Sequence, residues 1–328
     1  MKPPTASAPD PPAPVALAPP RPAAGRDPAL ASKGREVEEW LDLRFFRPVG
    51  VRIARRLAPT RVSPDQVTLW SLAVGLAAGH CFAYASPWVN ASGVALFVVS
   101  DLFDSADGQL ARLRGTFTRF GRTVDGLSDN ARFANLYAHL VWRLVHHGGW
   151  GVAPALALAV AAGLSHSWQS AAVDCIRQAF LELGVGAGSE LELPEDLAGE
   201  DAPRPGILAR VARGAYRAYV RRQTWLCPAT AALVRRVRAL EGAGAREAAR
   251  VERARAAYRA RARGVVRQSA WLGQNIRFAL VGVPAVLGWP AGFLWLTLLP
   301  LNAVLVALVR TQERRAARLL AGEVSRAG

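Results

Sequence analysis

Hydrophobic and polar positions alternate along this chain as long apolar runs joined by short polar connections. Two stretches, 89–111 and 120–145, are interrupted by Asp and Arg and fail a simple hydropathy test for membrane-crossing helices. Four other runs pass it, because they are nearly uncharged and close to the length that a bilayer requires: about 67–86, 151–173, 270–289 and 291–309. The pattern predicts an all-α integral membrane protein.

The distribution of basic residues indicates how many spans to count. The connections SPWVN, HHGGWG and GWPAG contain no Lys or Arg. The segment before the first run, the loop around Arg112–Arg122, the segment 182–268 and the tail RTQERRAARLL are all rich in Arg. Basic loops stay on the cytoplasmic side, and the alternation holds only with six spans. We therefore expect six transmembrane helices in the cell (inner) membrane, with both termini cytoplasmic.

The net charge limits the kinds of molecule that the chain can bind, and the cysteine content limits its disulfides and metal sites. The chain has 328 residues, 51% of them hydrophobic, and a formal net charge of +16. Such a charge suits nucleic acid or an anionic membrane surface. The basic flanks of the expected spans account for much of it, and Tyr258 is the only stacking ring in the Arg-rich run 245–264. We expect membrane lipids as partners and no nucleic acid. The three cysteines show no CxxC spacing, which argues against a disulfide scaffold or a zinc site.

Composition also divides the chain into segments. Residues 1–35 form a Pro/Ala-rich tail that we expect to be disordered, and residues 313–328 a cytoplasmic tail. Residues 36–181 hold an N-terminal interfacial helix and spans 1–4, and 269–312 hold spans 5 and 6. The interfacial helix rests on apolar and basic residues at helical spacing, although an amphipathic helix on a soluble face has the same pattern. Ser63 is the expected N-cap of the first span, with Pro64 at its first position.

The segment 182–268 is expected to be a cytoplasmic basic insert between the fourth and fifth spans. Its first part, LELGVGAGSELELPEDLAGEDAPRPG, is acidic and rich in Gly and Pro, which is typical of a linker. Its second part, AREAARVERARAAYRARARG, has strong helix propensity. We expect helices there that lie close to the membrane surface.

One polar stretch follows an apolar run directly: DLFDSADGQLARLRGTFTRFGRTVDGLSDN, from Asp101 to Asn130. Its carboxylates and small residues recur at helical spacing, which places them on one face of each of two helices joined by a short turn, RGTFTR. The first face holds Asp104, Asp107, Gly108 and Ala111, and the second holds Gly121, Asp125 and Asp129. The spacing therefore predicts a helical hairpin that directs four carboxylates into one small volume.

Four carboxylates in a low-dielectric hairpin repel one another strongly. They must take up protons, turn outward into water or bind cations. Hard divalent cations prefer oxygen ligands, and the small residues beside the carboxylates leave room for a bulky ligand. A solvated polar loop is the alternative, but a loop predicts neither a helical register nor small residues at matched positions. Ionisable groups at membrane depth favour a functional site.

The stretch resembles the signature of the CDP-alcohol phosphotransferases, D-x2-D-G-x2-A-R, about eight residues, then G-x3-D-x3-D. Every fixed position matches, in the order Asp104, Asp107, Gly108, Ala111, Arg112, Gly121, Asp125 and Asp129. Together with the span layout, the likeness extends over roughly 38–180 and 265–312. The tail 1–35 and the insert 182–268 are outside the common pattern.

The resemblance implies the chemistry and the cofactors. Such enzymes transfer a phosphatidyl-type group from a CDP-linked donor, such as the lipid CDP-diacylglycerol, to an alcohol and release CMP. It implies two divalent cations, Mg²⁺ or Mn²⁺, held by Asp104, Asp107 and Asp125, with Asp129 as a ligand or near-ligand and as the general base. It places Gly108, Ala111 and Gly121 in the cytidine nucleotide pocket and Arg112 near its phosphates or at the helix end. A homodimer is implied by the family alone.

The acceptor alcohol is less defined. An anionic acceptor such as an inositol phosphate or a glycerol phosphate needs a basic pocket, for which the candidates are Arg132, Arg177 and Arg277. Many relatives place Lys or Arg directly after the last aspartate, where this chain has Asn130. Asp101 lies outside the signature, one turn before Asp104. It suits acceptor binding or an interhelical hydrogen bond, and we favour the second role.

Other functions remain open from sequence. A polar CDP-alcohol donor could be combined with a lipid or sugar-phosphate acceptor. Membrane prenyltransferases also bind a diphosphate through Asp-rich helices and Mg²⁺, but their two Asp clusters are far apart in sequence. A non-catalytic protein that recruits a partner to the membrane through its basic insert is the third alternative. The intact set of four aspartates argues against this third alternative.

Overall fold

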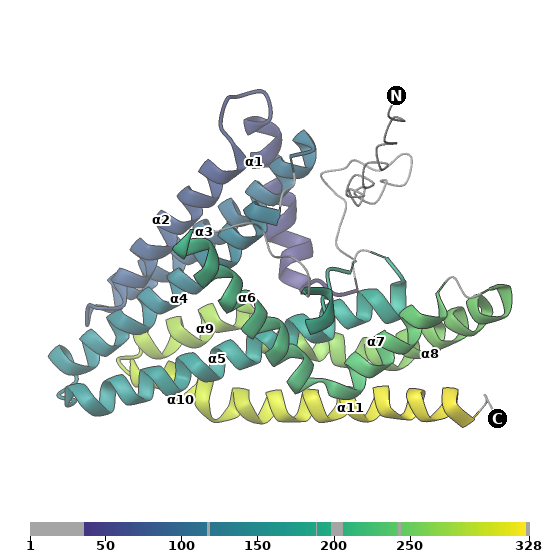
Figure 1. The fold of residues 1–328 in the computed structure, drawn as a ribbon. Helices are drawn as coiled ribbons and strands as arrows, with labels where there is room; N and C mark the ends of the chain where they lie inside the picture. The colour runs from purple at the N-terminus through teal and green to yellow at the C-terminus, as the bar shows by residue number, and fades with distance from the viewer. Residues whose placement is uncertain (1–35, 117–118, 188, 198–205, 242–243, 326–328) are drawn as a thin grey trace, which may run out of the picture.

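The computed structural model describes residues 36–116, 119–187, 189–197, 206–241 and 244–325, and every regular element in them is a helix (Figure 1). The expected all-α class is therefore confirmed, while the tail 1–35 lies outside the described residues. The elements run in chain order as η2 Asp42–Phe46, α1 Arg47–Leu57, α2 Pro64–Cys81, α3 Pro87–Arg114, α4 Arg119–His147, α5 Val152–Phe180, η3 Leu181–Val185, η4 Pro194–Leu197, α6 Ile207–Leu226, α7 Pro228–Leu240, α8 Ala245–Ser269, η5 Ala270–Leu272, α9 Gln274–Val286, α10 Ala291–Leu298 and α11 Pro300–Ser325.

The boundaries of α2, α3 and α4 follow from local chemistry. Ser63 caps α2, since its Oγ accepts from the Gln66 amide at 3.2 Å and its own amide donates to Gln66 Oε1 at 2.9 Å. Gly115 ends α3 with a φ of 64°, in the left-handed region that favours glycine. The next helix begins four residues later at Arg119. The expected N-cap is confirmed, as are the two helices with a short connection, and both of these helices pack against α2.

Stacked aromatic side chains pack α3 against α9, a helix that lies far from it in the sequence. Phe97 of α3 stacks on Phe82 with ring centroids 6.0 Å apart and on Phe278 of α9 at 4.9 Å. All three rings are buried in a core that continues through Leu136 of α4 and Phe293 of α10. This core fixes α9 against α3 and so positions the N-terminus of α9 near the polar end of α3.

The N-terminal helix packs against the polar half of α3. Gly50 of α1 allows close approach, because a Cβ there would meet Ser105 Oγ at 2.5 Å, and Ser105 Oγ donates to Phe46 O at 3.2 Å. Phe46 and Val51 are buried, whereas Trp40 is 71% exposed. The π-helical turn η2 changes the helical register between them.

Two segments of the described residues are long and apolar enough to cross a membrane, Pro87–Arg114 and Ala291–Gly322. The first corrects the expectation that 89–111 fails a hydropathy test. Its N-terminal half, 87–100, carries no charge, so the Asp and Arg residues are confined to the cytoplasmic-side half predicted from the loops. The second contains the expected span 291–309.

The other three apolar runs do not pass this test as helices of the described chain. The run 67–86 is cut short because α2 ends at Cys81, and α5 carries polar side chains after its first half. The run 270–289 is divided by Gly273 between η5 and α9. With 13 residues, α9 is about 20 Å long, against about 30 Å of hydrocarbon.

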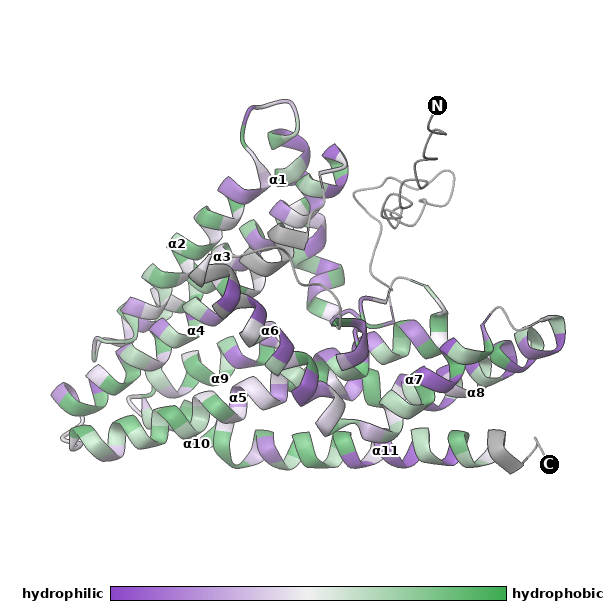
Figure 2. Cartoon of the chain, in the orientation of Figure 1, coloured by the Kyte–Doolittle hydropathy of each residue, from purple (hydrophilic) through white to green (hydrophobic). Residues whose placement is uncertain are grey.

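The insert is a folded part of the molecule. Figure 1 shows α7, α8 and the C-terminal half of α11 together at one end, away from α2 and α10. Figure 2 shows that α10 is mostly hydrophobic, while α8 carries many hydrophilic residues. The described part of the acidic first segment is not a free linker as expected, because Leu191 and Leu193 are buried in the core of α5, α7 and α8, and Leu197 is buried as well.

Polar contacts fix α6 to α5. Asp174 of α5 accepts hydrogen bonds from Tyr219 at 3.0 Å and from Gln223 at 2.7 Å. Burial raises the pKa of the Tyr219 phenol, and the neighbouring Asp174 carboxylate raises it further, so the phenol remains a donor at neutral pH. The first insert helix is thereby tied to the fourth expected span.

Glu313 of α11 should control the local stability of α7. Its carboxylate accepts from the amides of Ala229 and Thr230 at 2.6 and 3.1 Å, at the N-terminus of α7. Glu313→Ala leaves these donors unpaired, which costs about 1–2 kcal/mol. Hydrogen exchange measured by mass spectrometry should be roughly 5- to 30-fold faster over 228–240.

Glu247, a half-buried carboxylate in the first turn of α8, provides the matched control. Glu247→Ala should leave exchange over 228–240 at the wild-type rate. Equal protection of α7 in both variants would contradict the capping role of Glu313.

Candidate functional site

The polar half of α3 and the facing part of α4 form the candidate site. Asp104 and Asp107 lie one turn apart on α3, and Asp129 faces them from α4. The side chains of Asp104 and Asp129 are 31% and 39% exposed, whereas Asp107 is buried. Asp104 and Asp129 therefore share one partner, Arg132, while Asp107 lies one turn further along α3. The side chains of the other two α4 signature residues, Gly121 and Asp125, lie outside the described residues.

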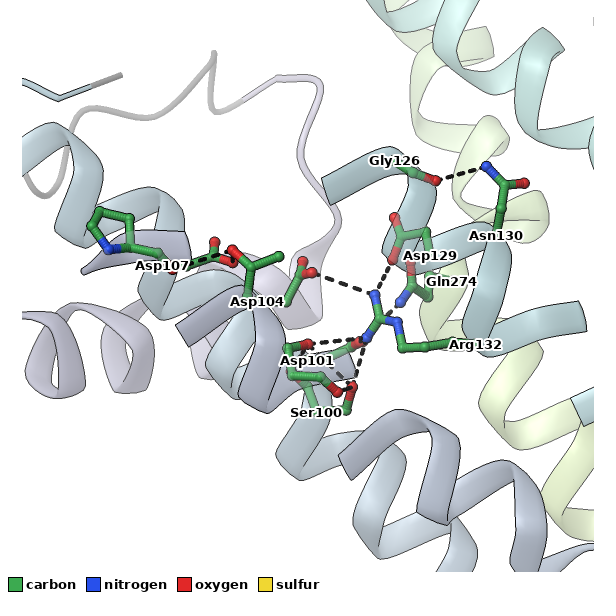
Figure 3. A network of polar contacts seen from close by, with 12 residues as sticks. Ser100, Asp101, Asp104, Asp107, Gly126, Asp129, Asn130, Arg132 and Gln274 are labelled. Carbon is green, nitrogen blue, oxygen red and sulfur yellow. Dashed lines mark hydrogen bonds and ion pairs between the residues drawn. The ribbon is translucent and has the colours of Figure 1, made fainter. Parts of the chain in front are cut away.

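A single guanidinium occupies the centre of this region (Figure 3). Arg132 of α4 is 1% exposed and forms an ion pair with Asp129, one turn earlier. Its Nη2 also lies 3.4 Å from Asp104 Oδ1, and its Nη1 lies 3.2 Å from Asp101 Oδ1. Three carboxylates against one guanidinium leave an excess of negative charge in a mostly buried place.

Small and hydroxyl residues make room for the Arg132 side chain. Its Nη1 donates to Ser100 Oγ at 2.7 Å. Ser100 and Ser71 bind each other across α2 and α3, since each hydroxyl donates to the other residue's carbonyl at 2.8 Å. Gly75 lies against the methylene stem, where a Cβ would meet Arg132 Cδ at 2.3 Å. The guanidinium is therefore held in a fitted position.

Asp107 is directed toward a different neighbour. Thr68 Oγ1 donates to Asp107 Oδ2 at 2.5 Å, and it also approaches Pro64 O at 3.2 Å. In Figure 3, Asp107 lies on the far side of Asp104 from Arg132. The hydroxyl of Thr68 thus orients one carboxylate of the signature from the first turns of α2.

The rest of the α3 signature is arranged around open space. A Cβ on Gly108 would meet no heavy atom within 4 Å. Ala111 is buried, and Arg112 is partly buried near the end of α3. On α4, Asn130 donates to Gly126 O at 2.7 Å, which engages the side chain that replaces the basic residue of many relatives. Space beside Gly108 is compatible with a ligand that lies against the α3 backbone.

The donor chemistry of the site fits a hard cation. Asp104, Asp107 and Asp129 offer only carboxylate oxygens, the ligands that Mg²⁺ and Mn²⁺ prefer. Among the described residues, which omit the Asp125 side chain, no three acidic, His or Cys side chains are arranged to hold one ion. The Arg132 guanidinium lies between Asp104 and Asp129 and pairs with both.

The three arginines expected to bind an acceptor have different partners. Arg132 lies among the carboxylates, and Arg177 of α5 donates to Glu39 Oε1 at 2.9 Å. Arg277 of α9 is buried and donates to Gln169 Oε1 at 2.9 Å and to Leu272 O at 3.2 Å. The guanidinium of Arg277 is thus engaged by the helices around it.

The N-terminus of α9 connects two of these groups. Gln274 donates to Asp101 Oδ1 at 2.8 Å, and the next residue, Asn275, donates to Glu39 Oε2 at 2.7 Å. The interhelical role favoured for Asp101 is confirmed as a contact. The carboxylate cluster and the Glu39–Arg177 pair therefore lie next to each other.

Sequence reasoning missed Thr68, Ser71 and Gln274. A signal exists for the first two, because Thr68, Ser71 and Gly75 recur at helical spacing in an otherwise apolar run, a pattern typical of close helix–helix contacts in membranes. Gln274 is 173 residues from its partner Asp101 and follows no local pattern.

Comparison with known proteins agrees with the site. Residues 61–181 match the model of the CDP-alcohol phosphatidyltransferase family. The chain is 33% identical over 113 residues to a phosphatidylinositol phosphate synthase of Mycobacteroides abscessus, covering 32% of this chain and 46% of that protein. It is 32% identical over 109 residues to the Mycobacterium tuberculosis protein of the same name (33% and 49%), and 34% over 101 residues to that of Corynebacterium glutamicum (29% and 42%). The matches span less than half the length of these relatives.

Gly75 should be intolerant of a side chain. Gly75→Ala places a methyl group on the Arg132 stem and forces a buried, ion-paired residue to move. Such overpacking costs about 1–3 kcal/mol. The thermal unfolding midpoint in detergent should fall by several degrees.

Gly163→Ala in α5 is the matched control, because its Cβ would meet Tyr137 at an ordinary 3.9 Å. It should leave the midpoint unchanged or raise it slightly. Equal midpoints for the two variants would mean that Arg132 is not packed against Gly75.

Proposed function

We propose that the chain, whose residues 61–181 match the model of the CDP-alcohol phosphatidyltransferase family, transfers a phosphatidyl-type group from a CDP-linked donor to an alcohol and releases CMP. The observation that carries this proposal is the full signature in the matched segment, in which Asp104 and Asp129 share the guanidinium of Arg132 and Asp107 lies one turn further along α3. Their oxygen-only donor set and the open space beside Gly108 support it.

Asp104, Asp107, Asp125 and Asp129 would hold two divalent cations, Mg²⁺ or Mn²⁺. When bound, the cations would neutralise the donor diphosphate and make CMP a better leaving group. Thr68 would orient Asp107 for this role, since its hydroxyl already engages one Asp107 oxygen. Nucleotide binding, proton transfer and acceptor binding would depend on residues of the protein itself.

The nucleotide would lie along the small residues of the signature. Gly108, Ala111 and Gly121 would line the cytidine pocket, and Arg112 would approach the phosphates. The space next to Gly108 favours this arrangement, because a ligand can contact the α3 backbone there. Any larger residue at 108 would reduce that space.

Asp129 would act as the general base. Its partly exposed carboxylate is accessible to an acceptor hydroxyl. The hydroxyl oxygen would form a bond to the phosphorus that carries the lipid, the bond from that phosphorus to the CMP oxygen would break, and the hydroxyl proton would pass to Asp129.

The acceptor would be an inositol phosphate. The three relatives above are named phosphatidylinositol phosphate synthases, and a phosphorylated acceptor requires cationic groups near the base. Arg177 is the best placed candidate, because Glu39 and Asn275 link it to the side of the site occupied by Asp101 and Gln274. Arg132 and Arg277 are each 1% exposed, whereas the Arg177 side chain is 25% exposed, so they would contribute less.

The membrane arrangement would contain six spans, with α2, α3, α4, α5, η5–α9 and α10–α11 crossing the bilayer. The basic loops support cytoplasmic termini and a cytoplasmic active site. Exposed Trp40 and Phe45 near Arg44 suit an N-terminal helix in the membrane interface. The protein would act in the inner membrane as a homodimer, with 182–268 as a cytoplasmic insert.

Purified protein with CDP-diacylglycerol, Mn²⁺ and an inositol phosphate should release CMP, and chelation with EDTA should stop the release. Glycerol phosphate, free inositol and no acceptor should be run in parallel. Preferred turnover of glycerol phosphate would replace the proposed acceptor. Absence of CMP with every acceptor, and with CDP-linked polar alcohols as donors, would overturn the catalytic proposal.

Asp129→Asn should lower turnover by about 100- to 10,000-fold, because the amide cannot accept the hydroxyl proton. Binding of the CDP-linked donor should be largely retained, which equilibrium dialysis with a labelled donor can measure. Asp65→Asn, at an exposed position in the first turn of α2, is the matched control and should retain turnover. Full activity of Asp129→Asn would remove Asp129 as the base.

A further inference from the structure

Arg132 bridges the same carboxylates that the proposed function assigns to divalent cations. Its Nη2 is shared between Asp129 and Asp104, both of which belong to the signature. Its Nη1 is turned toward Asp101, which does not. A guanidinium with this double attachment supplies the positive charge that the carboxylates need when no ion is present.

The two ends of the guanidinium differ in how firmly they are held. Nη1 has a neutral anchor at 2.7 Å in Ser100, and its carboxylate partner Asp101 is itself fixed by Gln274 at 2.8 Å. The Nη2 partners Asp104 and Asp129 have partly exposed side chains. The Nη1 contacts are therefore buried and supported by the protein, while the Nη2 contacts reach the open side of the site.

We propose that Arg132 is the resident cation of this site. It holds Asp104 and Asp129 when divalent ions are absent, and it competes with those ions for the two carboxylates. When ions bind, Nη2 gives up these carboxylates, while Asp101 and Ser100 keep Nη1 in place. Asp101 is then the permanent counter-ion of Arg132 rather than a metal ligand. This inference rests on the proposed function, because it takes Asp104 and Asp129 as metal ligands.

If Arg132 competes with the ions, its removal has the opposite effect on ion binding from the one expected of a purely structural Arg132. If Arg132 only orients the carboxylates, its removal disorders them and weakens ion binding. If Arg132 competes, its removal strengthens ion binding, and the ion-free protein becomes less stable because its carboxylates repel one another. Coupling between two ligands of one protein is typically about 5- to 150-fold in affinity, and this is the expected range of the gain.

The decisive variant is the double substitution Asp101→Asn with Arg132→Gln. It removes one negative and one positive charge, so the net charge of the site equals that of the wild type. It also leaves neither partner of the buried pair without its counter-ion, which favours folding. Because bulk electrostatics are unchanged, a gain in affinity reports the loss of the competitor itself.

Mn²⁺ binding should be measured on the full chain in detergent, stripped of metal and without any CDP-linked donor, from the electron paramagnetic resonance signal of free Mn²⁺. The double variant should bind Mn²⁺ about 5- to 150-fold more tightly than the wild type. Arg132→Gln alone should also bind more tightly, and its unfolding midpoint in EDTA should fall and be restored by Mn²⁺. Arg143→Gln is the control, because Arg143 is equally buried on α4 but donates to Ala285 O. It should leave Mn²⁺ affinity unchanged.

Equal or weaker Mn²⁺ binding by the double variant would overturn the inference. Absence of Mn²⁺ binding in both the wild type and the double variant would overturn it together with the metal assignment. If the double variant gains affinity but the wild type releases no CMP with any acceptor, the resident-cation role stands and the proposed function fails. The two conclusions are therefore separable.

Discussion

The need to compensate several carboxylates inside a helical hairpin governs this part of the molecule. Asp101, Asp104 and Asp129 lie within reach of one another in a largely buried region, where unpaired charge is costly. Arg132 meets this need from α4. The position of Arg132 also restricts its neighbours. Gly75 must lack a side chain, and Ser100 must offer a hydrogen-bond acceptor.

The same constraint explains why α3 has two unlike halves. Its first half is uncharged and packs through Phe97 into the aromatic core, whereas its second half meets α1 through Ser105 and Gly50. At its end, Arg114 donates to the carbonyls of Leu57, Ala58, Thr60 and Val62, which closes the connection between α1 and α2. A helix that is apolar enough to cross a membrane therefore continues into a polar site without a break.

Local features of this arrangement were predictable from sequence, and long-range ones were not. The helical register of Asp104 and Asp107 on α3 and the Ser63 cap depend on helical periodicity and on neighbouring residues, and both were confirmed. The contact between Asp101 and Gln274 depends on the packing of α3 against α9, which no local pattern encodes. The insert was misread in its first part, because buried leucines such as Leu193 stand among acidic residues that dominate its composition. The hydropathy test misjudged 89–111 because it averaged an uncharged first half with a second half that contains Asp and Arg.

The insert and the site share α5. Asp174 receives Tyr219 and Gln223 from α6, while Arg177, three residues later, pairs with Glu39 beside the N-terminus of α9. Residues three apart lie on neighbouring positions of one helix face, so both sets of contacts act on the same turn. Glu313 ties α7 to α11 at the far end of the insert. One turn of α5 therefore connects the insert, through Asp174, to the Glu39 side of the site, through Arg177.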